Sequence, residues 1–417
     1  MTKPTWFDKR IEQALLEHQS PNDEQAFFIY QLDALKIHLA KLQQQDVIKL
    51  WFAVKANPLS KIIQTLDSEN FNFDVASSGE LAQVLAQGID PSRVLNTGPA
   101  KSKKQLKAFV EKGVSTFVVE SLNQLIWLNE VMTEKKVIEQ ASSEQGLIKR
   151  PTVLLRVQLQ WPDGEKNPLG GNSLTPFGLS VAEWQHIRVT DFPAVDICGL
   201  HIFQWGNMLS NAKMYSLWGQ MVEPLTTLAD SIGMTLEILD LGGGLGIDYL
   251  GDGAELSWQQ ILTDLASIKS QANVKEIWLE LGRFAVAECG YYVVPVVDKK
   301  INYEQEQLIL SAGVNHIIRP AITDQPFPVT LLRSSAEEEK YFDIHGPLCT
   351  SIDKLGHLLL PHDVTVGDRL IFGYCGAYGF TESMPFFLCH ELAAEYVFQG
   401  GKLLEVRPAL PASSYLA

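Results

Sequence analysis

Polar residues end several short apolar segments of this 417-residue sequence, and they are of types that can do chemistry. They are Lys55 after LWFAV, Asp74 in NFDVASSGE, Arg156 in LLRVQL, His201 after GL, and Glu280 and Arg283 in ELGR. In a barrel of parallel strands the catalytic groups lie at the carboxyl ends of the strands. The positions of these residues therefore predict one shared active site.

Lys55 is the residue of this set best suited to covalent chemistry. The segment before it is mostly apolar, so its amine should be at least partly desolvated. Desolvation lowers the pKa of an amine toward the range in which it forms a Schiff base. The competing interpretation is an ordinary surface lysine, and the neighbouring segments favour the functional role.

The run DLGGGLGID contains Gly243 and Gly244 and suggests a phosphate site. Its spacing lacks the full dinucleotide-binding fingerprint, and it falls late in the strand order. A cradle of backbone amides for a single phosphate is the better interpretation. His201 and Glu280, each taken alone, also fit a buried core histidine and a simple ion pair.

Strands and helices alternate along the chain as far as Arg283. Strand-like apolar segments occupy residues 48–54, 71–76, 93–98, 116–119, 152–159, 197–203, 236–244 and 276–281, after a first strand at 26–30 and a helix at 32–44. Strands this apolar have no face in water, which predicts a parallel sheet covered by helices. Eight of them favour a closed (β/α)8 barrel over an open sheet.

The pattern changes after Arg283. Long β-branched and aromatic runs at residues 291–300, 307–313, 328–332, 341–346 and 368–374 are typical of an antiparallel β-domain. We therefore expect a barrel over residues 27–284 and a β-domain over residues 285–417, with residues 1–26 packed on the second domain.

Composition restricts the partners of the chain. The formal net charge is -15 and the pI is near 5.1, so DNA, RNA or an anionic membrane would be repelled. No segment approaches the roughly 18 apolar residues that span a bilayer, and the first residues lack a signal-peptide core. We expect a cytoplasmic protein with a small-molecule substrate. The five cysteines form no CxxC pair and no Cys/His cluster, so neither disulfides nor a metal site are expected.

Seven motifs occur in an order that resembles the fold-type III pyridoxal phosphate (PLP) decarboxylases, the family of the diaminopimelate, ornithine and arginine decarboxylases. They are FAVKANP, FDVASSGEL, LDLGGGLG, ELGR, AGVNHIIRPA, HGPLCTSID and GAYG. The resemblance covers about residues 27–398, and alanine racemase is a more distant barrel relative. It implies a PLP-binding TIM barrel, a C-terminal β-domain and removal of the α-carboxylate of an amino acid.

The resemblance also implies roles for individual residues. Lys55 would bind PLP covalently, His201 would stack on its ring, and Glu280 would bond the pyridine nitrogen. A carboxylate keeps that nitrogen protonated, so the ring accepts the electron pair that CO2 leaves behind, whereas an arginine there would suit a racemase. The remaining cofactor contacts would come from Asp74, Arg156, Gly243, Gly244, Arg283 and Tyr378.

The segment HGPLCTSID carries the family's catalytic cysteine as Cys349. The resemblance implies that Cys349 protonates the α-carbon after CO2 departs, and that Cys349 and Asp353 reach into the active site of a neighbouring subunit. A homodimer with shared sites is therefore expected, and two-fold dimers are also the commonest oligomers. A buried, inert thiol is the alternative interpretation.

The chain departs from the family pattern where the far end of the substrate is bound. Thr350 replaces the acidic residue that contacts a distal amine, whereas Arg319 remains available for a carboxylate and Thr323 replaces a tyrosine. Further departures are Pro176 in TPFG, the loop residues Phe203, Gln204 and Trp205, and the candidate pocket residues Phe386, Phe387 and His390.

These departures predict a substrate whose far end is acidic, acylated or attached to something larger. The siderophore precursor citryl-diaminopropionate and a carrier-tethered amino acid are examples. The alternatives are a conventional decarboxylase of diaminopimelate, ornithine or lysine, an amino-acid racemase, and a PLP-binding protein without turnover. Glu280 and Cys349 disfavour the racemase, and the β-domain together with Cys349 disfavours the non-catalytic protein.

Overall fold

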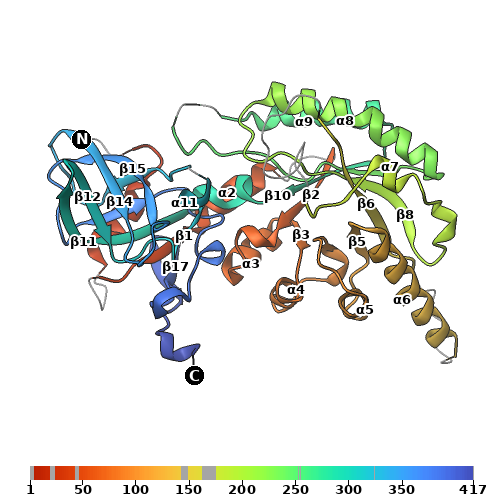
Figure 1. Ribbon diagram of the computed structural model, residues 1–417, viewed down its shortest axis with the longest axis horizontal. Coiled ribbons are helices and arrows are strands. Elements are labelled where there is room, and N and C mark those ends of the chain that lie inside the picture. The colour runs from red at the N-terminus through yellow and green to blue at the C-terminus, as the bar shows by residue number, and fades with distance from the viewer. Residues whose placement is uncertain are drawn as a thin grey trace.

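The computed structural model describes residues 4–18, 24–42, 47–141, 149–161, 175–251, 253, 255–323 and 325–416. It has two units, a barrel surrounded by helices and a β-rich unit from which the C-terminal segment projects (Figure 1). Among these residues, no helix combines the length and the apolar character needed to cross a membrane.

Eight parallel strands close the barrel, which confirms the predicted architecture. Pairings of β5 with β6 and of β10 with β2 complete the ring. In ring order the strands are β2 (Ile48–Ala53), β3 (Asn72–Val75), β4 (Val94–Asn96), β5 (Thr116–Val119), β6 (Thr152–Gln158), β8 (Asp196–His201), β9 (Ile238–Asp240) and β10 (Glu276–Leu281). The short strand β7 (Leu179–Ser180) pairs with β6 outside this ring.

Helices cover the barrel, and serine side chains start several of them. The hydroxyl oxygens of Ser77, Ser102, Ser210 and Ser257 each accept the N–H of the residue three positions later. This N-cap satisfies a backbone donor that the first helical turn leaves unpaired. The helices are α2 (Leu32–Leu42), α3 (Ser60–Ser68), α4 (Ser78–Leu85), α5 (Lys103–Glu111), α6 (Leu122–Ala141), α7 (Val181–Trp184), α8 (Asn211–Ile232), α9 (Trp258–Ala272) and α10 (Arg283–Val286).

The interior of the barrel is filled in layers. One buried cluster consists of Trp51, Leu95, Val118, Leu154, Cys198, Ile238 and Trp278. Side chains alternate along a strand, so the residue two positions later points to the same side of the sheet. In β10, β9 and β6 that step leads to Glu280, Asp240 and Arg156. A polar layer therefore follows the apolar one at the carboxyl ends of the strands.

The second unit is a mostly antiparallel sheet in which the pairs β1–β17 and β12–β14 are parallel. Its strands are β1 (Phe27–Gln31), β11 (Gly290–Asn302), β12 (Gln305–Leu310), β13 (Val329–Leu331), β14 (Glu339–His345), β15 (Lys354–Pro361), β16 (Arg369–Phe372), β17 (Ala394–Gln399) and β18 (Lys402–Arg407). The helices α1 (Lys9–Glu17) and α11 (Arg319–Thr323) accompany it. This arrangement confirms the β-domain that the sequence predicts after the barrel.

Strand β1 lies in the second sheet, although the sequence suggests residue 27 as the start of the barrel. It pairs with β11 on one edge and with β17 on the other. Phe27 also shares a buried core with Ile11 and Leu15 of α1. The sequence pattern hides this because α2 follows β1 just as a helix follows each barrel strand. We propose that the barrel unit begins after Gln31.

Candidate active site

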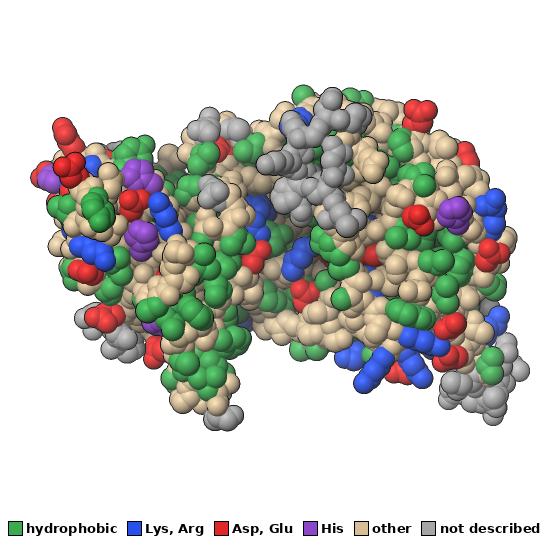
Figure 2. All heavy atoms as spheres, in the orientation of Figure 1, with side chains coloured by type: hydrophobic (Ala, Val, Ile, Leu, Met, Phe, Trp, Pro, Cys, Tyr) green, Lys and Arg blue, Asp and Glu red, His purple; other side chains and the backbone are tan. Residues whose placement is uncertain are grey.

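A cavity of about 380 Å³ lies at the carboxyl ends of the barrel strands, against the second unit. Figure 2 shows acidic and basic side chains in the recess between the two units. Eight of the residues predicted from the sequence line the cavity: Lys55, Arg156, Gly243, Gly244, Glu280, Arg283, Arg319 and Tyr378. Two others, His201 and Asp74, are buried beside residues of this lining.

Lys55 lies in a 3-10 turn directly after β2, and its side chain is exposed to the cavity. Its depth in the protein by itself lowers the amine pKa, but the acidic groups of Asp74, Tyr378 and Glu280 outweigh this and raise the pKa above its usual value. The predicted lowering of the Lys55 pKa is therefore wrong. The apolar residues that precede Lys55 in sequence matter less than the carboxylates that face it from β3 and β10.

Asp74 and Arg156 are each held by a neighbouring side chain. Thr97 Oγ1 donates to Asp74 Oδ1 at 2.5 Å, and burial together with the charge of Glu280 raises the pKa of Asp74 to about 8. Arg156 Nη1 donates to Glu120 Oε1 at 3.1 Å. Because these partners are themselves buried, both side chains are fixed in orientation, Arg156 in the cavity lining and Asp74 directly behind Thr97 of that lining.

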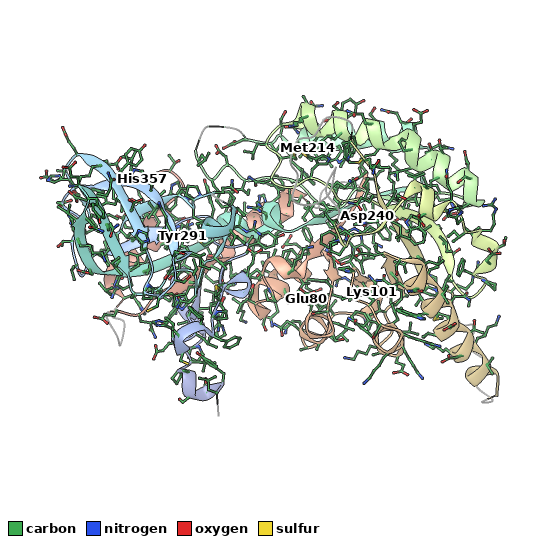
Figure 3. The ribbon with its side chains drawn as sticks, viewed as in Figure 1. Glu80, Lys101, Met214, Asp240, Tyr291 and His357 are labelled. Carbon is green, nitrogen blue, oxygen red and sulfur yellow. The ribbon has the colours of Figure 1, made fainter. Side chains whose placement is uncertain are left out.

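His201, Asp240 and Glu280 come from the adjacent strands β8, β9 and β10 and form a buried polar cluster, with Asp240 inside the barrel (Figure 3). His201 Nε2 lies 3.2 Å from Glu280 Oε1. Burial raises the pKa of Glu280, but His201, Lys55 and Arg156 lower it to about 2, so the carboxyl is ionised. The close contact with His201 is not aligned as a hydrogen bond, so Glu280 Oε1 accepts no hydrogen bond from the described residues. A buried carboxylate oxygen needs such a partner, and a protonated ring nitrogen of a cofactor would supply it.

Asp240 is a member of this cluster that the sequence reasoning missed, although it ends the strand segment LEILD. Its Oδ1 accepts the N–H of Gly242 at 2.8 Å. Burial and the charge of Glu280 raise the pKa of Asp240 well above its usual range, which keeps the carboxyl neutral. The ligand atoms of His201, Asp240 and Glu280 lie within 4.8 Å of one another.

The glycine-rich turn after β9 fits its neighbours because it carries no side chains. A Cβ atom on Gly243 would lie 2.4 Å from the carbonyl oxygen of Glu280. A Cβ atom on Gly244, which has φ +103°, would lie 2.7 Å from the carbonyl oxygen of Trp205. Arg283 lines the same cavity, and its Nη1 donates to the hydroxyl of Tyr249 at 3.1 Å. Close-packed backbone amides beside an arginine suit a phosphate group.

The loop Phe203–Gln204–Trp205, whose role the sequence left open, supports the glycine turn. Gln204 Oε1 accepts the N–H of Leu159 at 3.0 Å, and Gln204 Nε2 donates to the carbonyl oxygen of Leu159 at 2.7 Å. Trp205 meets Trp161 edge-on, with ring centroids 5.9 Å apart. Phe203 lines the cavity. The loop is thus fixed to the chain beyond β6 and contributes an aromatic wall.

The second unit completes the cavity with Tyr378, Arg319 and Glu382. The N–H of Tyr378 donates to the carbonyl oxygen of Ala56 at 2.8 Å, which ties the GAYG segment to the turn that holds Lys55. The guanidinium of Arg319 lies 4.3 Å from the centroid of the Tyr378 ring. It also donates from Nε to Glu382 Oε2 at 2.9 Å and from Nη2 to Glu382 Oε1 at 2.7 Å.

Glu382 is a charged residue of the cavity lining that the sequence reasoning missed. The stretch that contains it was expected to provide Phe386, Phe387 and His390, but none of these three lines this cavity. Phe386 instead packs edge-on against Tyr415, with ring centroids 4.9 Å apart. Glu382 follows no strand and belongs to none of the family motifs, so no pattern in the sequence marked it.

Cys349, Thr350 and Asp353 lie on the turn between β14 and β15, outside the lining of this cavity. Cys349 is exposed. Asp353 is buried, and its carboxylate accepts the N–H groups of Val314 at 2.8 Å and Leu348 at 2.7 Å. The Asp353 carboxylate therefore shapes its own turn, and its contact with a substrate in a neighbouring subunit stays a prediction.

The closed barrel, the amine of Lys55, the ionised Glu280 and the glycine turn together define a PLP-dependent enzyme of the barrel class. The family described as "Pyridoxal-dependent decarboxylase, pyridoxal binding domain" matches residues 33–287. The companion "Pyridoxal-dependent decarboxylase, C-terminal sheet domain" matches residues 238–376. The chain belongs to this family, and it is a carboxy-lyase that uses PLP.

Relatives of known activity match most of the chain. The 2-[(L-alanin-3-ylcarbamoyl)methyl]-2-hydroxybutanedioate decarboxylase of Staphylococcus aureus is 26% identical over 398 residues, which cover 91% of this chain and 96% of the relative. The diaminopimelate decarboxylase of Pseudomonas aeruginosa is 30% identical over 369 residues, which cover 85% of this chain and 82% of the relative. The crystal structure of diaminopimelate decarboxylase from Helicobacter pylori, complexed with L-lysine, shares the fold with a TM-score of 0.82 at 20% identity, and the match covers 97% and 98% of the two chains.

Proposed function

We propose that this enzyme decarboxylates an α-amino acid whose far end is an acyl group with carboxylates, and citryl-diaminopropionate is the leading example. Arg319 carries this proposal, because it lines the cavity while its Nη1 bonds to no described residue. A guanidinium matches a carboxylate through two parallel hydrogen bonds. Thr350 stands where the family pattern has an acidic residue, so this position offers no carboxylate that could bind a distal ammonium.

The Staphylococcus aureus relative supports the same substrate class. Its name describes an alanine unit joined through an amide to a hydroxybutanedioate, so two carboxylates lie beyond the amide. The similarity extends over nearly the whole length of both chains. A decarboxylase that acts on such a compound needs a cation at the far end of its cavity, and Arg319 meets that requirement.

Each residue of the site would have its own role in the decarboxylation. PLP supplies the sink for the electron pair that remains when CO2 departs. Lys55 would hold the cofactor covalently, and the low pKa of Glu280 would keep a proton on its ring nitrogen. Gly243, Gly244 and Arg283 would hold its phosphate. Anchoring the substrate at its far end directs its amino end toward the opposite wall, so distal binding orients the reacting bond.

Cys349 belongs to this proposal as the proton donor of a homodimer. It lies on an exposed turn outside the cavity of its own chain, and the bonds of Asp353 to Val314 and Leu348 hold that turn in shape. A second copy related by a two-fold axis would bring its own Cys349 to this cavity. The α-carbon would then receive its proton from the thiol after CO2 has left.

A conventional diamino-acid decarboxylase is the second candidate function. Glu382 favours it, because this carboxylate lines the cavity and an ammonium could bind there. The 30% identity to a diaminopimelate decarboxylase points in the same direction. Against it, both oxygens of Glu382 already accept hydrogen bonds from Arg319.

CO2 release from a panel of substrates tests the proposal. The PLP-loaded enzyme is supplied with citryl-diaminopropionate, meso-diaminopimelate, lysine or ornithine, and Lys55→Ala serves as the inactive control. We expect CO2 from the acylated substrate with the highest kcat/KM. Equal or faster release from meso-diaminopimelate, lysine or ornithine would overturn the proposal in favour of the diamino-acid enzyme.

A further inference from the structure

We infer that Glu382 is a positioning residue that orients Arg319 and thereby selects substrates with a distal carboxylate. The inference deepens the proposed function and rests on it. Glu382 belongs to neither the barrel nor the motif-bearing strands, yet its side chain reaches the same cavity as Lys55. Its contacts determine which edge of the Arg319 guanidinium faces the substrate.

The pairing of the two side chains is side-on. Nε and Nη2 of Arg319 donate to Oε2 and Oε1 of Glu382 at 2.9 and 2.7 Å. The guanidinium has five N–H donors in a rigid plane. The pair with Glu382 uses two of them along one edge, so the two donors of Nη1 and the second donor of Nη2 remain at the tip. These donors form a fork that can bind one more carboxylate.

Two aromatic side chains hold this arrangement in place. The ring of Tyr378 lies 4.3 Å from the guanidinium of Arg319 and restricts it to one plane. Glu382 ends the 3-10 turn Phe380–Glu382. The ring of Phe380 in that turn packs edge-on against His316 at 5.9 Å and lies 4.3 Å from the guanidinium of Arg407. The turn is therefore anchored at its start, and Glu382 is presented from a fixed point.

This geometry separates two roles that Glu382 could have. As a positioning residue, Glu382 needs oxygens that accept from Arg319, and glutamine keeps one such oxygen. If Glu382 instead binds a substrate ammonium, it needs its negative charge, which glutamine lacks. If Glu382 positions Arg319, Glu382→Gln should therefore bind the substrate better than Glu382→Ala does. If Glu382 binds an ammonium, the two variants should be equally impaired.

The experiment measures KM, kcat and the competitive inhibition constant of citrate for the PLP-loaded full-length enzyme. Loss of a charge-assisted pair in Glu382→Ala should raise KM and the citrate constant about 10- to 100-fold, with kcat changed less than about threefold. Glu382→Gln should show about a third of this effect or less on a logarithmic scale. Arg319→Ala should raise both constants at least as much as Glu382→Ala.

A matched control exists in the second unit. Arg333 donates from Nε and Nη2 to Asp368 at 2.7 and 2.8 Å, the same side-on geometry, and neither residue lines the cavity. Asp368→Asn should leave KM and the citrate constant unchanged. Equal impairment of the alanine and glutamine variants would overturn the inference, as would an unchanged KM in both or a fall in kcat with loss of the bound-cofactor absorbance.

Failure of the proposed function and failure of the positioning role of Glu382 give different results. If the wild-type enzyme releases CO2 only from lysine or ornithine, the proposed substrate class is wrong. Citrate inhibition then still decides the role of Glu382, because it requires no turnover of a carboxylate-bearing substrate. Citrate that binds Glu382→Ala as tightly as wild type would refute the positioning role in either case.

Discussion

Replacing Gly243 with alanine tests whether the glycine turn and Glu280 form one cofactor site. The added methyl group would lie 2.4 Å from the carbonyl oxygen of Glu280, whereas ordinary contacts begin near 3.4 Å. The turn must therefore move away from β10 by about 1 Å, because both contacting parts are backbone and neither can rotate aside. Overpacking of this kind costs about 1–3 kcal/mol.

The cost should appear in cofactor binding, because the turn and Glu280 both line the cavity. If it falls entirely on the PLP-bound state, the dissociation constant of PLP rises about 5- to 150-fold. Titration of the apoprotein with PLP, followed by the absorbance of the bound cofactor, measures this constant.

Gly219→Ala in α8 is the control, since a Cβ atom there meets no atom of the described residues within 4 Å. An alanine inside a helix should stabilise the chain by about 0.5–1 kcal/mol without changing PLP affinity. If Gly243→Ala binds PLP as tightly as the wild type does, the turn is not packed against β10 in the way described and the reasoning is refuted.

Three further predictions concern the proton donor Cys349, the contact of Glu280 with the cofactor's ring nitrogen, and the pH dependence of stability. Mixing Lys55→Ala with Cys349→Ala subunits should restore roughly a quarter of wild-type activity, because half of the dimers are mixed and each has one intact site; no restoration would exclude shared sites. Glu280→Gln should lower kcat by about 10²- to 10³-fold while PLP still binds, as measured by CO2 release and cofactor absorbance. Burial lowers the pKa of Lys101 to about 8, against 10.5 for a free lysine. Wild type should therefore gain up to about 3 kcal/mol of stability relative to Lys101→Met as pH rises from 8 toward 10.5, which urea unfolding would measure; a constant difference would contradict this.

The sequence predicts the barrel well because its signal is local. Most barrel strands are short, mainly apolar segments followed by a helix, and such segments have few alternatives to a buried parallel sheet. The position of β1 is the exception. Its apolar residues and the helix after it look the same as those of a barrel strand, and only its pairing with β11 and β17 assigns it to the second sheet. Such non-local pairings leave no mark in a single sequence.

The alternation of side chains explains which site residues the sequence could reveal. Glu120 and Asp240 stand two positions after Val118 and Ile238 of the apolar layer, the same step that leads from Trp278 to Glu280. A count of every interior position would therefore have found both. Glu382 lies in a turn between strands, so no such count applies to it. The rise of the Lys55 pKa was also out of reach, because the groups that cause it come from other strands.

Both units contribute residues to the lining of the same cavity. The barrel provides Lys55, Glu280 and the glycine turn, whereas the second unit provides Arg319 and Glu382, to which we assign the far end of the proposed substrate. The units are joined close to the reacting end, since Asn57 Nδ2 donates to the carbonyl oxygen of Gly376 at 2.9 Å two residues after Lys55. A change at Glu382 therefore alters the contacts assigned to the far end without touching that junction. If Arg319 and Glu382 bind the far end of the substrate as proposed, substitutions at these two residues should change KM far more than kcat.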